Sequence, residues 1–166
     1  MKLIKLLDQE GTTLVSDAIN QNILRILVSS ESSVSELSRT LNIPTLKLWR
    51  RIQKLLQENL IELTSTQKVG NLEKKLYRAT ATQYIPYQYF NYQPKDANLK
   101  KAYKIYFEIQ KQMMSATAAY GDVPKGADPI DYTLFVQMQT FTQLCGDAEI
   151  QNKIISLKEK LEKYEK

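Results

Sequence analysis

Five basic side chains fall within residues 37–57, a stretch that contains no acidic residue. They are Arg39, Lys47, Arg50, Arg51 and Lys54. Guanidinium and ammonium groups bind phosphate oxygens, and arginine also reads guanine edges in the major groove of DNA. A helix with one apolar and one cationic face can present such groups to a groove. The stretch is therefore a candidate nucleic-acid-binding surface.

The sequence supplies little for other chemistry. It has no His, and its single cysteine, Cys145, excludes a disulfide within the chain and a usual zinc site. It also lacks a glycine-rich phosphate loop and an imidazole for general acid or base catalysis. We therefore expect a protein that is not an enzyme and that uses no cofactor and no metal. Cys145 is predicted to be a small buried apolar residue rather than a redox switch.

Composition is that of a globular protein of 166 residues, with 43% hydrophobic and 25% charged residues and a net charge of +5. The basic surplus lies in the first half: residues 1–83 carry 12 Lys or Arg and 8 Asp or Glu, against 11 and 10 in residues 84–166. No run of 18 apolar residues is present, and acids occupy positions 8 and 10. We expect a cytoplasmic, nucleoid-associated protein with no membrane contact.

Three helices are predicted to position the basic residues. Residues 17–28 repeat apolar side chains at helical spacing, and Ser16–Asp17 is the candidate N-cap pair of this helix. A short helix at 35–41, capped by Ser35, is followed by a third helix at 44–58 that begins at a proline.

The third helix has two different faces. Its apolar residues Leu48, Ile52, Leu55 and Leu56 follow one another at steps of four, three and one, which leaves the basic residues on the other side. Asn59 suits the left-handed end of this helix.

Two alternating runs, 60–64 and 75–80, follow and are predicted to pair as a hairpin with Gly70–Asn71 at its tip. Three helices and a hairpin in this order are typical of a winged helix-turn-helix.

Parts of this region resemble ArsR-type regulators. Residues 18–27 (AINQNILRIL) resemble their first core helix and 34–43 (VSELSRTLNI) their turn-forming helix. Residues 60–62 (LIE) resemble the end of their recognition helix and the start of the wing. The resemblance covers residues 14–82 and implies a dimeric DNA-binding fold with the third helix in the major groove. The cysteines of the family's metal sensors are missing from the turn-forming helix, so metal sensing is not implied.

Double-stranded DNA is the expected partner. The side chains predicted to contact it lie on the third helix and on the wing, and they are Thr45, Leu46, Lys47, Trp49, Arg50, Arg51, Gln53, Lys54, Lys68, Lys74 and Lys75. Leu46 and Trp49 stand where the family usually has small polar groups, and Trp49 is expected to pack in an interface. The alternative for the basic residues is a merely solvated helix face.

The second half is predicted to be helical. An aromatic, proline-bounded link at 84–98 precedes helices at 99–119 and 129–144 and a final helix capped at Gly146–Asp147. The final helix carries an apolar seam at heptad spacing, predicted to form a homodimer contact: Ile150, Ile154, Leu157, Leu161 and Tyr164. Packing within the chain is the alternative. A small-molecule effector is possible for such a tyrosine-rich region, but no polar cluster indicates one.

The sequence thus predicts a mainly α protein with a small β-hairpin wing. A winged helix-turn-helix DNA-binding domain at 1–83 is followed by the link at 84–98 and an all-helical dimerisation or effector region at 99–166. The predicted function is transcriptional regulation. The alternatives are a chromatin or architectural protein that binds DNA with little sequence preference and an adaptor that uses the winged helix to bind proteins.

Overall fold

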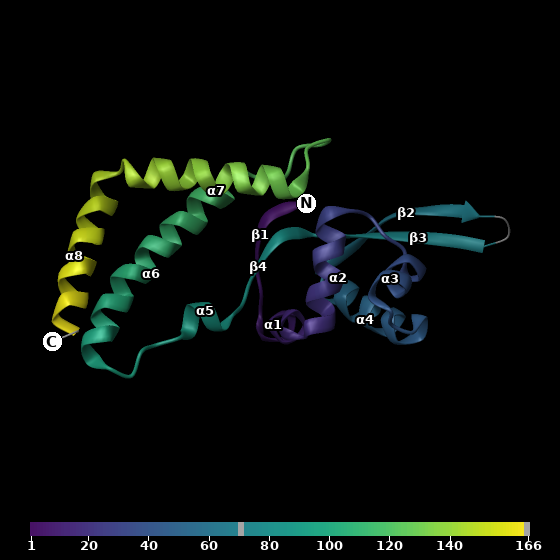
Figure 1. Cartoon of the computed structure of the whole chain (residues 1–166), viewed down its shortest axis with the longest axis horizontal. Coiled ribbons are helices and arrows are strands. Elements are labelled where there is room, and N and C mark those ends of the chain that lie inside the picture. Colours follow the sequence, from purple (N-terminus) through teal and green to yellow (C-terminus); the bar gives the residue numbers. More distant parts are fainter. Residues whose placement is uncertain (70–71, 165–166) are drawn as a thin grey trace.

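The computed structural model describes residues 1–69 and 72–164 of the chain. Its elements, in chain order, are β1 (Lys2–Leu6), α1 (Gln9–Ser16), α2 (Ala18–Ser29), α3 (Val34–Leu41), α4 (Thr45–Gln57), β2 (Ile61–Val69), β3 (Leu72–Ala79), β4 (Ala81–Ile85), α5 (Gln88–Asn91), α6 (Ala97–Ala118), α7 (Pro129–Cys145) and α8 (Ala148–Tyr164). Figure 1 shows the N-terminal helices and the hairpin at one side of the molecule and helices α6, α7 and α8 at the other.

Helices α2, α3 and α4 share one hydrophobic core. Ile23 and Leu27 of α2, Leu37 of α3, and Leu48 and Ile52 of α4 are each at most 1% exposed. Helices of this length gain most of their stability from burying such an apolar face. The core therefore determines how each helix is rotated about its axis.

The turn between α3 and α4 is short. Asn42 ends α3 in the left-handed conformation, with φ 52° and ψ 45°, and Pro44 directly precedes α4. The Ser38 hydroxyl donates to the Ile43 carbonyl oxygen at 2.6 Å, which satisfies a backbone acceptor in the turn.

The cap of α3 differs from the prediction. Ser33, not Ser35, caps the helix, and it forms a reciprocal capping box with Glu36. The helix begins at Val34, one residue earlier than predicted, and this places Glu36 at the third helical position that the box requires.

Strands β2 and β3 form the antiparallel wing, with a register shift between Leu63 and Ser65. The wing projects away from α6, α7 and α8 (Figure 1). Its predicted tip, Gly70–Asn71, lies outside the described residues. Asn59, between α4 and the wing, has φ 53°, as its predicted left-handed conformation requires. The predicted winged helix-turn-helix is thus confirmed.

A second, parallel pair of strands was not predicted. Strand β1 pairs with β4, so that Lys2 lies opposite Ala81 and Leu6 opposite Ile85. Leu3 and Leu7 are 1% and 7% exposed. These two apolar side chains near the N-terminus are therefore buried within the chain itself.

The C-terminal helices follow the predicted boundaries closely. Helix α8 packs along α6, and α7 crosses from α6 to contact α2 and β4. Asp147 caps α8, because its carboxylate accepts hydrogen bonds from the amides of Glu149 and Ile150 at 2.8 and 3.0 Å. The prediction that Cys145 is buried was wrong: it ends α7 and is exposed.

Candidate nucleic-acid interface

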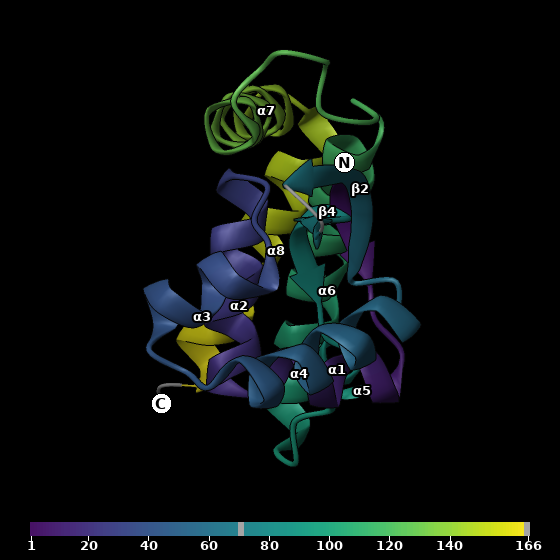
Figure 2. The same ribbon diagram turned by 90° about the vertical axis from the view of Figure 1, so that its right-hand side faces the viewer.

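The apolar face of α4 determines which of its polar side chains face solvent. Leu48, Ile52 and Leu55 have no exposed area, and they lie on one side of the helix. On the opposite side the exposed residues predicted to contact DNA are Thr45, Leu46, Lys47, Trp49, Arg50 and Lys54. Gln53 is half-buried. Viewed from the wing side of the molecule, α4 lies across the front of the domain (Figure 2).

Arg51 is held within the protein. Its Nη1 atom donates to Asp17 Oδ1 at 2.7 Å and to Asn20 Oδ1 at 2.9 Å, and its side chain is 23% exposed. Asn20 is buried and in turn donates to the Leu14 carbonyl oxygen at 2.9 Å. This network joins α4 to the junction of α1 and α2. Its partners lie 34 and 31 residues away from Arg51, so spacing within the helix gave no sign of it.

The carboxyl group of Asp17 has two structural roles. It caps α2 by accepting from the amides of Ile19 and Asn20 at 2.9 and 3.1 Å, and it also pairs with Arg51. Burial alone would raise the pKa of Asp17, but the hydrogen bonds from the Asn20 amide and from Arg51 outweigh burial and lower that pKa.

The far end of α4 is bound by a residue that no sequence pattern singled out. The ammonium group of Lys5, on β1, donates to the backbone carbonyl oxygens of Glu58 and Asn59. A cation at this position satisfies terminal carbonyls and interacts favourably with the helix dipole. Lys5 thereby joins the end of α4 to the β1–β4 pair.

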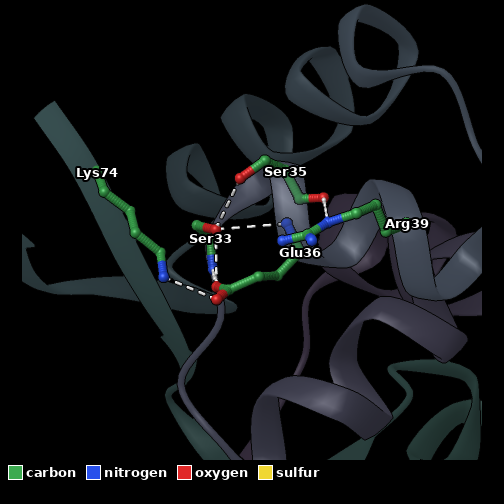
Figure 3. A network of polar contacts seen from close by, with 5 residues as sticks. All are labelled: Ser33, Ser35, Glu36, Arg39 and Lys74. Atoms are coloured by element: carbon green, nitrogen blue, oxygen red, sulfur yellow. Dashed lines mark hydrogen bonds and ion pairs between the residues drawn. The ribbon is translucent and has the colours of Figure 1, made fainter. Parts of the chain in front are cut away.

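The lysines of the wing have different surroundings. Lys68 and Lys75 are exposed. Lys74, in contrast, donates to Glu36 Oε1 at 2.7 Å and so joins β3 to the N-terminus of α3 (Figure 3). The Lys74 ammonium group, with two hydrogen bonds from Ser33, lowers the pKa of Glu36 from 4.5 to about 2.

Two grooves flank the exposed side of α4, and a third, which includes Glu10 and Glu58, borders its C-terminal end. One, between α4, α3 and β3, is lined by Ser35, Thr45, Trp49 and Lys75 among others. The other lies between α4 and the α1–α2 junction, and its cationic lining residues are Lys47, Arg50, Arg51 and Lys54. Within residues 1–69 and 72–164, no ion pair involves Lys47, Arg50 or Lys54. A polyanion could therefore approach α4 on both sides.

The seam predicted for dimerisation is partly used within the chain. Ile150 is 3% exposed because α8 packs against α6. Ile154 is 47% and Leu161 39% exposed, and Leu157 is half-buried. The side chain of Tyr164 lies outside the described part of the structure.

Two further properties of the described residues bear on function. They contain no group of three or more acidic, cysteine or histidine side chains that could hold a metal ion. None of the helices in this part of the chain is long and apolar enough to cross a membrane.

Comparisons with known proteins give similarity to solved structures only. No family model and no curated protein matches the chain. HlyU from Vibrio cholerae N16961 is 23% identical, with 44% of this chain and 74% of that one covered and a TM-score of 0.37. A second similar structure is the winged helix-turn-helix DNA-binding domain of Mb0332 from Mycobacterium bovis, which is described as homodimeric and as a possible ArsR-family regulator. It is 17% identical, with 43% of this chain and 62% of that one covered and a TM-score of 0.37.

Bacillus subtilis PadR in complex with operator DNA covers more of the chain, 82% of this one and 94% of its own, at 15% identity and a TM-score of 0.34. Because these TM-scores are low, the assignment of the fold rests on the order and contacts of the elements described above. Those elements define a winged helix-turn-helix protein with an added C-terminal helical region.

The pair of Glu36 and Lys74 predicts a pH-dependent contribution to stability. The pKa of Glu36 is lower in the folded state, so the stabilisation is fully present above about pH 4.5 and is lost as the pH falls towards 2. Glu36→Gln, which keeps an acceptor for Ser33, should lower the free energy of unfolding by about 1 kcal/mol at pH 7, a value discounted for solvent exposure. Urea unfolding of both proteins between pH 7 and pH 2.5 measures the difference.

Glu73→Gln, on the same strand as Lys74, is the matched control for loss of one carboxylate. A loss of stability that is equal for Glu36→Gln at pH 7 and at pH 2.5 would contradict the assigned ion pair.

Proposed function

We propose that the protein is a DNA-binding transcriptional regulator that inserts α4 into the major groove. The observation that carries the proposal is the exposed, acid-free side of α4, where Lys47, Arg50 and Lys54 take part in no ion pair with another described residue. The buried leucines of α4 hold this side outward. A helix presented in this way fits the width of the major groove of B-DNA.

The exposed residues of α4 are assigned different contacts according to their position on the helix. Lys47, Arg50 and Lys54 follow each other at steps of three and four, so they form one row about 10 Å long at a rise of about 1.5 Å per residue. We assign this row to phosphate contacts and, for Arg50, to a guanine edge. Thr45 and Leu46 lie at the N-terminal end of α4, the end that usually meets base edges, and Leu46 is 64% exposed.

Lys68 and Lys75 on the wing are assigned to phosphates beside the groove. Arg51 and Lys74 are assigned mainly to positioning, since each already binds an acidic side chain of the protein at 2.7 Å. Trp49 is 49% exposed next to the wing, and we place it against the sugar-phosphate backbone. The protein would then act in the cytoplasm on the nucleoid, without a catalytic role.

Two other functions use the same surface. An architectural protein would bind DNA through phosphates alone, and an adaptor would not bind DNA. Selecting genomic fragments with the purified protein supplies a preferred sequence, and titration of that sequence and of random DNA across salt concentrations separates the three functions. Equal affinity for both DNAs at every salt concentration supports the architectural protein, and no binding supports the adaptor.

For the wing we predict an effect on salt dependence. Lys68→Gln with Lys75→Gln should reduce the slope of log affinity against log salt by about 0.9 for each phosphate that the wing no longer binds, with sequence preference unchanged. Fluorescence anisotropy with labelled duplexes measures the slope. The control, Lys125→Gln with Lys158→Gln, removes the same charge from the C-terminal half. An altered sequence preference with an unchanged slope would mean that the wing reads bases.

We also propose that two copies associate through the C-terminal helices, which would hold two α4 helices on one DNA site. Helix α7 exposes a row of apolar side chains, Ile130, Leu134, Met138 and Phe141, each 52–59% exposed. Ile154 and Leu161 of α8 are exposed as well, at 47% and 39%. Burial of such surface is the main driving force for stable association.

Charged substitutions test the dimer without removing α8, whose Ile150 belongs to the chain's own core. Leu134→Glu with Met138→Glu, or Ile154→Glu with Leu161→Glu, should convert the dimer to monomers and weaken binding to the operator. Sedimentation velocity measures the first effect and anisotropy the second. Gln139→Glu, an exposed change on α7, is the control. A monomeric parent protein, or dimers that survive both double substitutions, would contradict the proposal.

A further inference from the structure

A cleft between α6 and the segment after α5 has no part in the proposed DNA interface. Its volume is about 580 Å³, within the range of about 300–1,000 Å³ usual for small-molecule sites. The segment after α5 forms one wall with Tyr92 and the buried Pro94, and the first turns of α6 form the other. In Figure 1 this segment runs below α6, on the side of the molecule opposite the wing.

Aromatic rings form the apolar wall of the cleft. Tyr103 and Phe107 lie one turn apart on α6, with ring centroids 5.9 Å apart and planes inclined by only 12°. Phe90 meets Phe107 at 5.9 Å and 69°, and Tyr92 meets Tyr103 at 5.7 Å and 82°. The edge-on contacts hold the two nearly parallel rings in place, and such rings favour a flat aromatic guest.

Lysines line the same cleft. Lys100, Lys101 and Lys104 are all exposed, and the described residues that line the cleft include no acid. Asp96 and Glu108 are the nearest acids in sequence, each four residues from one of these lysines, and the Asp96 carboxylate already accepts from the amides of Asn98 and Leu99 at 2.8 Å. Three ammonium groups beside an apolar wall select a guest that is both apolar and anionic.

We propose that this cleft binds a small organic anion with a flat aromatic body. The ring system would lie on Tyr103 and Phe107, and its carboxylate, sulfonate or phosphate group would be bound by Lys100, Lys101 and Lys104. A second copy of the chain is a poorer occupant, because a two-fold contact through this face would gather the lysines of both copies in one interface whose described lining residues include no acid to pair with them.

Two fluorescent probes of similar shape test the proposal. They are 8-anilinonaphthalene-1-sulfonate, which is anionic, and N-phenyl-1-naphthylamine, which is uncharged. The native protein should bind one equivalent of the anion. Replacing Lys100, Lys101 and Lys104 together by Gln should weaken the anion about tenfold or more, which corresponds to about 1.4 kcal/mol, and leave the uncharged probe within about twofold.

Two further variants control the test. Arg25, Arg39 and Lys125, all exposed and away from α6, when replaced by Gln give the same change in net charge at other sites and should leave both probes unaffected. Phe107→Leu should weaken both probes, and thermal unfolding verifies that each variant is folded.

Three results would overturn the proposal. The first is several weak sites for the anion in the native protein. The second is an equal loss of anion binding in the two triple variants. The third is displacement of the anion by a thymidine dodecamer but not by 1-naphthoate, which would make the cleft a site for single-stranded nucleic acid.

Discussion

Burial of one face of α4 determines what the N-terminal domain presents to its surroundings. Leu48, Ile52 and Leu55 have no exposed area, and they pack in the same core as residues of α2 and α3. Rotating α4 to bury its other face would place lysine and arginine in an apolar core, at a cost of several kcal/mol for each unpaired charge. The apolar face therefore fixes the cationic face in solvent.

Polar contacts then fix the ends of α4 and the wing. Arg51 joins the middle of the helix to α2, and Lys74 joins the wing to Glu36 on α3. Lys5 binds the carbonyl oxygens of the two residues that follow α4. Three basic residues thus contribute to the framework on which the remaining basic residues are presented. Basic residues of the same type have different roles because their neighbours in space differ.

Much of the N-terminal fold could be predicted from the sequence. Helical spacing located α2 and α4. Of the predicted capping pair Ser16–Asp17, Asp17 caps α2, and Asn59 has the predicted left-handed conformation. These signals are local, because each depends on residues within one or two helical turns. The same holds for Asp147 at the start of α8.

Features that depend on distant residues were not predictable in this way. The pairing of β1 with β4 joins strands about 80 residues apart, and a five-residue strand has too little pattern to reveal it. The same reason explains why Arg51 and Lys74 could not be distinguished from Arg50 and Lys75 by spacing. For the cap of α3, three serines occupy positions 32, 33 and 35, and only the reciprocal bond with Glu36 distinguishes Ser33.

Two adjacent arginines of α4 allow DNA binding and structural support to be measured separately. Arg50→Gln should weaken binding of the preferred duplex by about 1–3 kcal/mol and leave the urea midpoint unchanged. Arg51→Gln should lower the free energy of unfolding by about 1 kcal/mol through loss of its bonds to Asp17 and Asn20. Unchanged DNA affinity in Arg50→Gln, measured by anisotropy on folded protein, would contradict the proposal that this side of α4 contacts DNA.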